Sequence, residues 1–344
     1  MEREKIGSRR MAPSGLKAKE KTMPVRKRST KRKPARDIAQ EITDKLIARL
    51  EEGGPLPWRR PWQSSALAMP LRSTGEAYKG INNLLLHIET ACNGYASPYW
   101  MTFRQAKELG GSVRKGERSS TVIYYGTAPK KGDAVAEGGD GAEGGMYRFL
   151  KGYAVFNASQ IDGLPEHFHP ILSPVDTGVR MEDRLQGIVD RMPFAVEHGY
   201  EHAAYREHGD RIVMPDPSRF ESVEAHAATL LHEMQHATGI ESRLNRECFA
   251  RYHADEEQRA EEELVAEIGA MQLGARLGMA GEHIDNHAAY VGGWLRRLKS
   301  DKRFIFKAAA AAQTGCDWLL DRAGVAEYRA PVLPEREDDV RDAA

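Results

Sequence analysis

Apolar residues recur at helical spacing in several long stretches of the chain and alternate with polar residues in several short ones. Ile38, Ile42 and Leu46 follow at four-residue intervals and predict an amphipathic helix over 37–52, which the Gly-Gly-Pro run at 53–55 ends. The same spacing predicts further helices beginning near 84 and at 102, and over 181–192, 220–238, 256–277, 283–298 and 303–319. Runs of β-branched and aromatic residues predict strands at 99–101, 121–125, 147–157, 194–196, 203–206 and 210–215.

The order of these elements indicates two folded domains. Strands and helices intermingle over 37–161, a proline-containing stretch at 162–178 is typical of a linker, and mainly helical segments with three short strands fill 179–325. Residues 127–145 consist largely of glycine, alanine and acidic residues, which predicts a flexible hairpin loop or a disordered insertion. A chain of 344 residues is long enough for a core in each domain.

Charge is unevenly distributed although the formal net charge is zero. Residues 1–36 hold 14 basic and 3 acidic residues with little apolar content, so we expect a disordered basic tail that either contacts phosphates or only aids solubility. The last residues, 326–344, form an acidic tail. The sequence contains no run of about 18 apolar residues and no apolar signal-peptide core, so we expect a cytoplasmic protein without a membrane segment. The isolated Cys92, Cys248 and Cys316 suggest reduced core residues rather than disulfides or thiolate zinc ligands.

The most informative motif is HExxH, at residues 232–236 within the predicted helix 220–238. Residues four apart share one face of a helix, so His232 and His236 can direct two imidazoles at one zinc ion, with Glu233 beside them. Zinc lowers the pKa of its bound water towards about 7, and Glu233 would then take a proton as this water attacks a carbonyl. Chance occurrence in an ordinary amphipathic helix is the competing interpretation.

A third ligand is needed for a catalytic zinc site. An extended HExxHxxGxxH motif would place a histidine at 242, where this chain has Ser242, so a ligand is expected from the acidic run 261–267. We choose Glu263 as that ligand and Glu267, one turn later, as the acceptor of the free N–H of a ligating histidine. A solvated helix face is the competing interpretation of this run.

The first domain interleaves aromatic and basic residues, a combination that suits stacking on unpaired bases together with neutralisation of phosphates. The pattern is strongest in the Pro-Trp-Arg-Arg-Pro-Trp run at 57–62 and along the strand at 147–157, although tryptophans that cap a small core would give the same pattern. The candidate DNA-binding residues are Trp58, Arg59, Arg60, Trp62, Tyr78, Lys79, Asn82, Trp100, Arg114, Lys115, Arg148 and Tyr153.

Several separate motifs, in this order, resemble the ArdC-type antirestriction proteins of conjugative plasmids and other mobile elements. The matching segments are 99–106, 110–117, 153–157, 162–165, 229–239, 262–269, 287–290, 294–295 and 301–306. The resemblance covers nearly everything from Asp37 to about Asp321 and excludes the basic tail and the glycine-rich stretch.

This resemblance implies an α+β protein with an N-terminal α/β single-stranded-DNA-binding domain and a C-terminal, mainly helical zincin-like metallopeptidase domain with a small sheet. It implies zinc at His232, His236 and Glu263, with Glu233 as catalytic base, and it favours Glu263 over Glu262 and Glu267 through the spacing of related zincins. The implied function is protection of incoming DNA during conjugative transfer, with single-stranded DNA and an unknown protein substrate as partners. A non-catalytic protector of single strands whose zincin domain is a scaffold, and a housekeeping metalloprotease associated with DNA, are the alternatives.

Overall fold

The computed structural model describes residues 37–52, 69–129, 146–170, 180–278 and 288–325 of the chain. Backbone contacts group the described residues into one compact unit. Among the described residues, no helix combines the length and the apolar character that crossing a bilayer requires.

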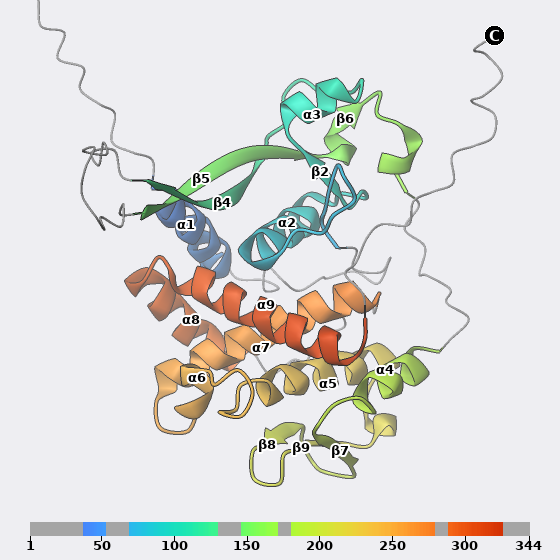
Figure 1. The fold of residues 1–344 in the computed structure, drawn as a ribbon, viewed down its shortest axis with the longest axis vertical. Coiled ribbons are helices and arrows are strands. Elements are labelled where there is room, and N and C mark those ends of the chain that lie inside the picture. The colour runs from blue at the N-terminus through green and yellow to red at the C-terminus, as the bar shows by residue number, and fades with distance from the viewer. Residues whose placement is uncertain (1–36, 53–68, 130–145, 171–179, 279–287, 326–344) are drawn as a thin grey trace, which may run out of the picture. The chain divides into compact units, whose positions relative to one another are not determined.

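The N-terminal part of the described chain is a small sheet with helices against it (Figure 1). Its helices are α1 (Ile38–Glu51), α2 (Gly80–Asn93) and α3 (Phe103–Glu108), followed by short 3₁₀ turns at Ala158–Gln160 and Glu166–Phe168. Its strands are β1 (Leu71–Arg72), β2 (Tyr99–Met101), β3 (Ser112–Val113), β4 (Ser120–Pro129), β5 (Met146–Asn157) and β6 (Ile161–Asp162).

Strands β4 and β5 form a long antiparallel ribbon in the four-stranded sheet of order β1-β2-β5-β4, and β3 pairs with β6 separately. The structure extends β4 to Pro129, so the expected loop over 127–145 begins later than predicted; residues 130–145 lie outside the described part. Pairing decides this, because Gly126, Thr127 and Ala128 have little strand character of their own but lie in register with β5. The ring of Phe149 covers Gly126, where a β-carbon would come within 2.3 Å of it.

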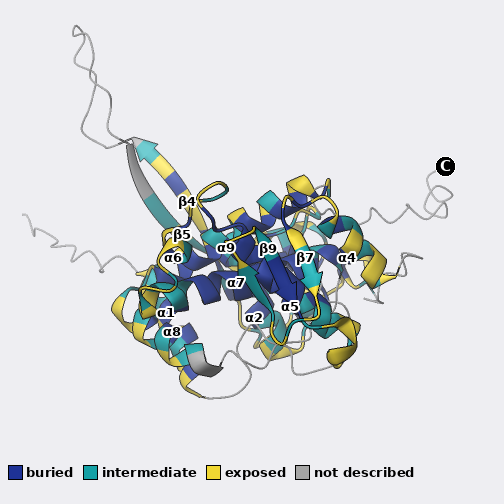
Figure 2. Ribbon diagram, turned by 90° about the horizontal axis from the view of Figure 1, so that it is seen from below, coloured by how far each residue is buried: buried dark blue, intermediate teal, exposed yellow. Residues whose placement is uncertain are grey.

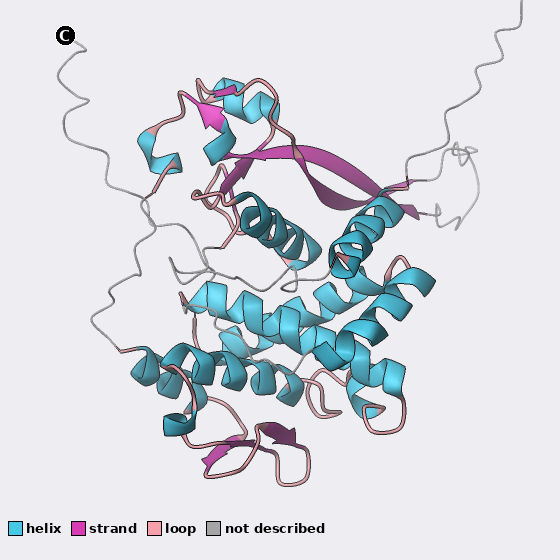
Figure 3. Cartoon of the chain, turned by 180° about the vertical axis from the view of Figure 1, so that it is seen from behind, coloured by secondary structure: helices cyan, strands magenta, loops and turns pink. Residues whose placement is uncertain are grey.

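The C-terminal part is mainly helical, with a three-stranded sheet (Figure 3). Its helices are α4 (Met181–Val189), α5 (Val223–Ala237), α6 (Glu247–Ala250), α7 (Glu256–Leu277), α8 (Ala288–Ser300) and α9 (Phe304–Arg322), with a 3₁₀ turn at Pro217–Arg219. The sheet has the order β7-β9-β8, from β7 (Ala195–His198), β8 (Ala204–Arg206) and β9 (Arg211–Met214), with β8 antiparallel and β7 parallel to β9. An α+β fold with a mainly helical C-terminal part is therefore confirmed.

Capping residues explain where the two site-bearing helices begin. Ser222 accepts a hydrogen bond from the backbone N–H of Ala225 at the start of α5, and Asp255 caps the first turn of α7 in the same way. Gly278 ends α7 in the left-handed conformation, at φ 62°. The pair α5 and α7 is almost wholly buried over its central turns (Figure 2).

One hydrophobic cluster joins the two parts of the chain. It contains Leu46 and Leu84 of α1 and α2 together with Leu264, Trp294 and Phe304 of α7, α8 and α9. Two polar contacts cross at the same place: Thr43 Oγ1 donates to the carbonyl of Lys302 at 2.9 Å, and the N–H of Gly80 donates to Gln313 at 2.8 Å. The predicted domains 37–161 and 179–325 therefore share apolar core, and their exact boundaries stay a prediction.

The expected linker 162–178 differs from the structure in its described part. Strand β6 and the turn Glu166–Phe168 occupy 161–168, and the side chains of Leu164 and Phe168 are buried in the shared cluster. The prolines misled the prediction, because two well-spaced apolar residues are enough to anchor a segment without regular structure. Residues 171–178 of the expected linker lie outside the described part, as do both expected tails, 1–36 and 326–344.

Candidate metal centre

Three potential ligand atoms from two helices converge on one point. Helix α5 presents His232 and His236, whose Nε2 atoms lie 3.1 Å apart, and α7 presents Glu263. The Glu263 carboxylate lies 3.5 Å from His232 Nε2 and 3.8 Å from His236 Nε2. The described part of the chain contains one group of three or more His, Cys, Asp or Glu side chains that could hold a metal ion, and these three residues form it.

The donor set fits a divalent metal ion. Two imidazole nitrogens and one carboxylate oxygen are the ligands of a His₂Glu catalytic zinc site, which keeps a fourth position open. All three side chains are buried, so their hydrogen-bonding groups face one another rather than solvent. His232, His236 and Glu263 would hold the ion.

Electrostatics show how strongly the three groups interact. Burial lowers the pKa of His232, but the hydrogen bond with Glu263 and the charges of Glu233 and Glu267 outweigh burial and raise this pKa to about 9. Burial raises the pKa of Glu263, but the hydrogen bond with His232 and the charge of His236 outweigh it and lower this pKa to about 2. The carboxylate is therefore ionised throughout the physiological range, as a metal ligand must be.

Glu233 lies beside the ligands, as the motif predicts. Its Oε2 accepts a hydrogen bond of 2.7 Å from the backbone N–H of Tyr205, in β8. Because β8 is an edge strand of the β7-β9-β8 sheet, this N–H lies on the side of the strand that no other strand covers. The sheet thus fixes the orientation of the carboxylate next to the metal ligands.

A buried network supports His236 from behind. His236 Nδ1 lies 3.1 Å from Glu262 Oε1, and Arg246 approaches the same carboxylate with its Nε, at 2.9 Å, and its Nη2, at 2.5 Å. Cys248 Sγ donates to Glu262 at 3.0 Å. Burial raises the pKa of Glu262, but the charge of Arg246 and the hydrogen bonds from His236 and Arg246 keep it well below its ordinary value.

This network adds an outer partner of the ligands that the sequence did not predict. The acceptor facing His236 is Glu262, which the sequence suggested only as an alternative ligand. Glu267 is buried and its charge raises the pKa of His232, and its role as acceptor of a histidine N–H stays a prediction. Adjacent helix positions lie about 100° apart, so periodicity alone cannot show which carboxylate of the run meets which histidine. Arg246 and Cys248 follow a turn after α5 and carried no local signal.

Two tyrosines approach the carboxylate ligand from its other side. The hydroxyl of Tyr252 donates to Glu263 Oε1, and Tyr290 also hydrogen-bonds with both Tyr252 and Glu263. Burial and the Glu263 charge raise the pKa of Tyr252, so its phenol stays protonated and donates. Sequence reasoning missed both residues.

The comparisons with known proteins agree with this geometry. One family model, described as the N-terminal domain of the anti-restriction factor ArdC, matches residues 36–156, and another, described as a zincin-like metallopeptidase, matches residues 183–311. The crystal structure of the antirestriction ArdC protein from plasmid R388, in its metal-free form, is 45% identical and has a TM-score of 0.71, covering 84% of this chain and 98% of that one.

The chain belongs to the ArdC family of antirestriction proteins. Its zincin-like domain implies a metal, and a Mn(II)-bound structure of the R388 protein, 44% identical with a TM-score of 0.67 over the same shares, is among the neighbours. The uncharacterized protein y4eC of Sinorhizobium fredii is 34% identical over 287 residues, 82% of this chain and 91% of that protein. DNA primase TraC of Escherichia coli is 35% identical over 296 residues, but the chain spans only 27% of that protein.

The structure sorts the candidate DNA-binding residues of this ArdC family member by exposure. Tyr78 and Trp100 are buried, so they cannot stack on a base, and the prediction for these two was wrong; both rings pack in one apolar cluster. Asn82 is engaged with the backbone of Ile123, accepting at 2.7 Å and donating at 2.8 Å. The side chains of Trp58, Arg59, Arg60, Trp62 and Arg148 lie outside the described residues.

Lys79, Lys115 and Tyr153 are exposed, as DNA contact requires. The guanidinium group of Arg114 is engaged within the protein, because it pairs with Glu117 at 2.8 Å and donates to the carbonyl of Ser159 at 2.6 Å. No comparison tests these contacts, so they stay predictions.

The β4–β5 ribbon carries an aromatic face that includes the predicted Tyr153 and also Tyr124, which the sequence analysis did not select. Directly opposed residues of an antiparallel pair point to the same side, so the pairs Tyr124 with Lys151 and Val122 with Tyr153 place both tyrosines and the lysine on one face. Tyr124 is 55% and Tyr153 is 42% exposed, and Lys151 Nζ lies 5.9 Å from the Tyr153 ring. We define Tyr124, Phe149, Lys151 and Tyr153 as the aromatic face.

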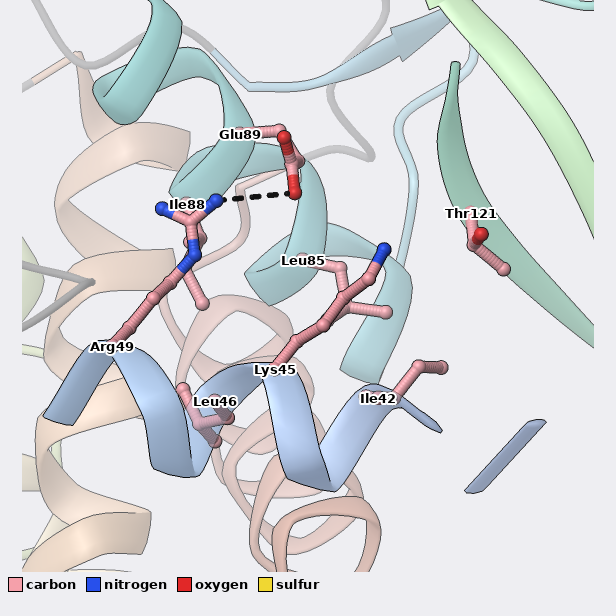
Figure 4. A pocket seen from close by; sticks show the side chains of 8 residues that line it. All are labelled: Ile42, Lys45, Leu46, Arg49, Leu85, Ile88, Glu89 and Thr121. Carbon is pink, nitrogen blue, oxygen red and sulfur yellow. Dashed lines mark hydrogen bonds and ion pairs between the residues drawn. The ribbon is translucent and has the colours of Figure 1, made fainter. Parts of the chain in front are cut away.

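A small cavity of about 30 Å³ is lined by residues that are far in sequence from the metal ligands (Figure 4). Helices α1 and α2 form it with Thr121 of β4, and Arg49 pairs across it with Glu89 at 3.5 Å. Its floor is apolar and it has room for about one water molecule. The cavity is therefore a packing gap and not a second candidate site.

Proposed function

We propose that this protein is a single-stranded-DNA-binding antirestriction protein with a zinc-dependent metallopeptidase site, acting in the cytoplasm on DNA that enters during conjugative transfer. The observation that carries the enzymatic part is the convergence of His232, His236 and Glu263 with Glu233 beside them. Membership of the ArdC family and the match to its N-terminal domain support the DNA-binding part. The relative named DNA primase TraC also supports an encounter with DNA.

In the proposed mechanism the chain supplies a base, its orientation and a dry environment. A zinc ion in the site would polarise a substrate carbonyl and acidify a water molecule. Glu233 takes a proton at its carboxylate while the N–H of Tyr205 holds its Oε2 in place.

For DNA binding we propose the aromatic face of the β4–β5 ribbon. Tyr124 and Tyr153 offer exposed rings for two bases, and Lys151 offers a charge for the intervening phosphate. Lys115 and Lys79 extend the basic surface, and the basic tail 1–36 adds charge that is not specific for position. Single strands should be preferred over duplex, because paired bases do not expose their faces for stacking.

The catalytic proposal is tested with Glu233→Gln in the full-length chain. The amide cannot accept a proton, so this variant should keep its zinc and its DNA affinity and lose hydrolysis of an unstructured protein such as casein. Glu224→Gln, on the same helix but remote from the ligands, is the matched control and should behave like wild type. Equal hydrolysis by wild type and Glu233→Gln would disprove the role of Glu233.

The DNA-binding proposal is tested on the two sides of one ribbon. Tyr124→Ala and Tyr153→Ala should each weaken binding of a single-stranded oligonucleotide by about 1–3 kcal/mol, measured by fluorescence anisotropy. Tyr125→Ala is the control, because Tyr125 is 58% exposed on the same strand but points to the opposite face. Equal loss from Tyr125→Ala and Tyr124→Ala would contradict binding by the aromatic face.

The second candidate is a protector of single strands whose zincin domain is not used for catalysis. The burial of the site favours it, since Glu233 is only 8% and His236 only 7% exposed. Hydrolysis of casein separates the two candidates, and plasmid transfer into a restricting host shows which activity protects the DNA. Because occupancy of DNA needs no turnover, we propose that protection survives Glu233→Gln and is lost with Tyr124→Ala combined with Tyr153→Ala, and the reverse pattern would make proteolysis the protective activity.

A further inference from the structure

Two histidines outside the metal centre face each other at close range. His198 is the last residue of β7, His226 lies in the first turn of α5, and their Nε2 atoms are 3.1 Å apart. The Nε2 atoms of the metal ligands His232 and His236 have the same separation. We propose that His198 and His226 form a second binding site for an imidazole-preferring divalent transition metal ion, Zn²⁺ above all.

The separation of the two nitrogens suits a shared ion. Zinc binds imidazole nitrogen at about 2.0–2.1 Å, so two such ligands at a tetrahedral angle lie roughly 3.3 Å apart. The observed pair is close to this distance, and the two rings lie with centroids 5.4 Å apart and planes inclined by 30°. Both rings point at each other along this line, so binding of one ion would turn each Nε2 lone pair from its neighbour towards the ion.

Backbone structure holds both histidines in place before any ion arrives. His198 lies in register with Met214 in the paired strands β7 and β9. The N–H of His226 donates to the carbonyl of Ser222 at 3.2 Å, and the ring of Phe220 packs edge-on against the His226 ring at 5.0 Å. Burial and the nearby His198 lower the pKa of His226, so the neutral imidazole that a metal requires is its ordinary state.

Neighbouring carboxylates are already engaged. Glu197 accepts from the hydroxyl of Tyr200 at 2.7 Å and pairs with Arg211 at 3.6 Å, and Glu201 pairs with Arg219 at 3.3 Å. The second site therefore offers two protein ligands and leaves its remaining positions to water. It should bind zinc more weakly than the three-ligand site, because each lost ligand weakens a metal site.

This second ion is distinct from the metal of the proposed peptidase site. His226 and the metal ligand His232 lie six residues apart on α5, which is about 9 Å along the helix axis, whereas metals that act as a catalytic pair lie about 3.5–4 Å apart. An ion between His198 and His226 would instead join the end of β7 to the first turn of α5. Binding to the folded state alone stabilises that state by mass action.

The test is the number of zinc ions that the metal-free, full-length protein takes up in competition with a chromophoric chelator. Wild type should bind two equivalents, the second more weakly, and both His198→Gln and His226→Gln should bind one. His202→Gln is the matched control, because His202 is an exposed histidine two residues beyond Tyr200 and outside the pair, and this variant should keep two equivalents. With the first equivalent bound, further zinc should raise the Tm of wild type and of His202→Gln but not that of His198→Gln.

Magnesium is the ion control, because it prefers oxygen ligands and should leave the Tm of every variant unchanged. His198 is exposed, so His198→Gln decides the result if His226→Gln fails to fold. Uptake of a single equivalent by wild type, or retention of the second equivalent by His198→Gln, would overturn the proposal and leave a simple hydrogen bond between the two imidazoles.

Discussion

Adding one methyl group at Gly269 should loosen the contact between the two helices that carry the metal ligands. Gly269 lies in α7, and a β-carbon there would come within 2.3 Å of Cδ and 2.5 Å of Cγ of Gln235, in α5. Gly315, in α9, meets the same side chain, with a β-carbon 2.2 Å from Gln235 Oε1. Gln235 is therefore packed between glycines of two other helices, and its Nε2 donates to Cys316 Sγ at 3.1 Å.

The sign of the effect follows from two opposing magnitudes. Replacing glycine by alanine inside a helix ordinarily stabilises it by about 0.5–1 kcal/mol, whereas overpacking a core costs about 1–3 kcal/mol. Because Gln235 is fully buried, it cannot swing into solvent, and the cost should exceed the gain. We expect Gly269→Ala to lower the free energy of unfolding by about 1–2 kcal/mol and to weaken zinc binding as α5 moves away from Glu263.

Urea unfolding of the metal-free protein and a zinc competition titration measure the two effects. Gly187→Ala is the control, because Gly187 lies in helix α4 with nothing within 4 Å of the added carbon, and it should stabilise by up to about 1 kcal/mol. Combining Gly269→Ala with Gln235→Ala removes the side chain that the added methyl group meets and should cost less than the two changes added together. A Gly269→Ala protein as stable as Gly187→Ala would refute the packing argument.

Three further predictions concern the charges of the site. Glu262→Gln removes the charge that faces His236 and Arg246, so zinc affinity should fall about 10–100-fold in a competition titration, and unchanged affinity would exclude a positioning role. Because the pKa of His232 is about 9, its ring is protonated at pH 7 in the metal-free protein, and calorimetry in two buffers should show release of about one proton per zinc bound; zero release would contradict this pKa. Folding lowers the pKa of Glu263 from 4.5 to about 2, which contributes on the order of 3 kcal/mol to the free energy of unfolding. This contribution is complete above pH 4.5 and is lost as the pH falls towards 2. Unfolding titrations of Glu263→Gln should therefore show a weaker loss of stability in acid than those of wild type.

Local signals were sufficient where a helix carries its own start and stop. The sequence predicts 256–277 for α7, and the structure has the same bounds, because Asp255 caps the start and Gly278 permits the left-handed end. The histidines of the motif converge for an equally local reason, since four residues make about one turn. The four-residue helix α6 was missed, because it is too short to show a period.

What could not be predicted depends on contacts between distant segments. Trp100 and Tyr153 look alike in sequence, as aromatic residues in strands, but a cluster with Leu86 and Val155 buries the first, whereas the second stays 42% exposed. The sequence could not show that Glu262 is the partner of His236, because this arrangement depends on a buried contact between Arg246 and Glu262 that residue spacing does not predict. Register, not composition, placed Tyr124 on the side of Tyr153 and Tyr125 on the other.

The hydrophobic cluster shared by α1, α2, α7, α8 and α9 bears on how such a chain is inherited. A gene fragment encoding either half alone would yield a polypeptide with an uncovered apolar face, prone to aggregate or to be degraded. Recombination should therefore move both halves as one cassette. The match to TraC fits this expectation, because 82% of the chain aligns with 27% of a far longer protein, so both halves occur together in it.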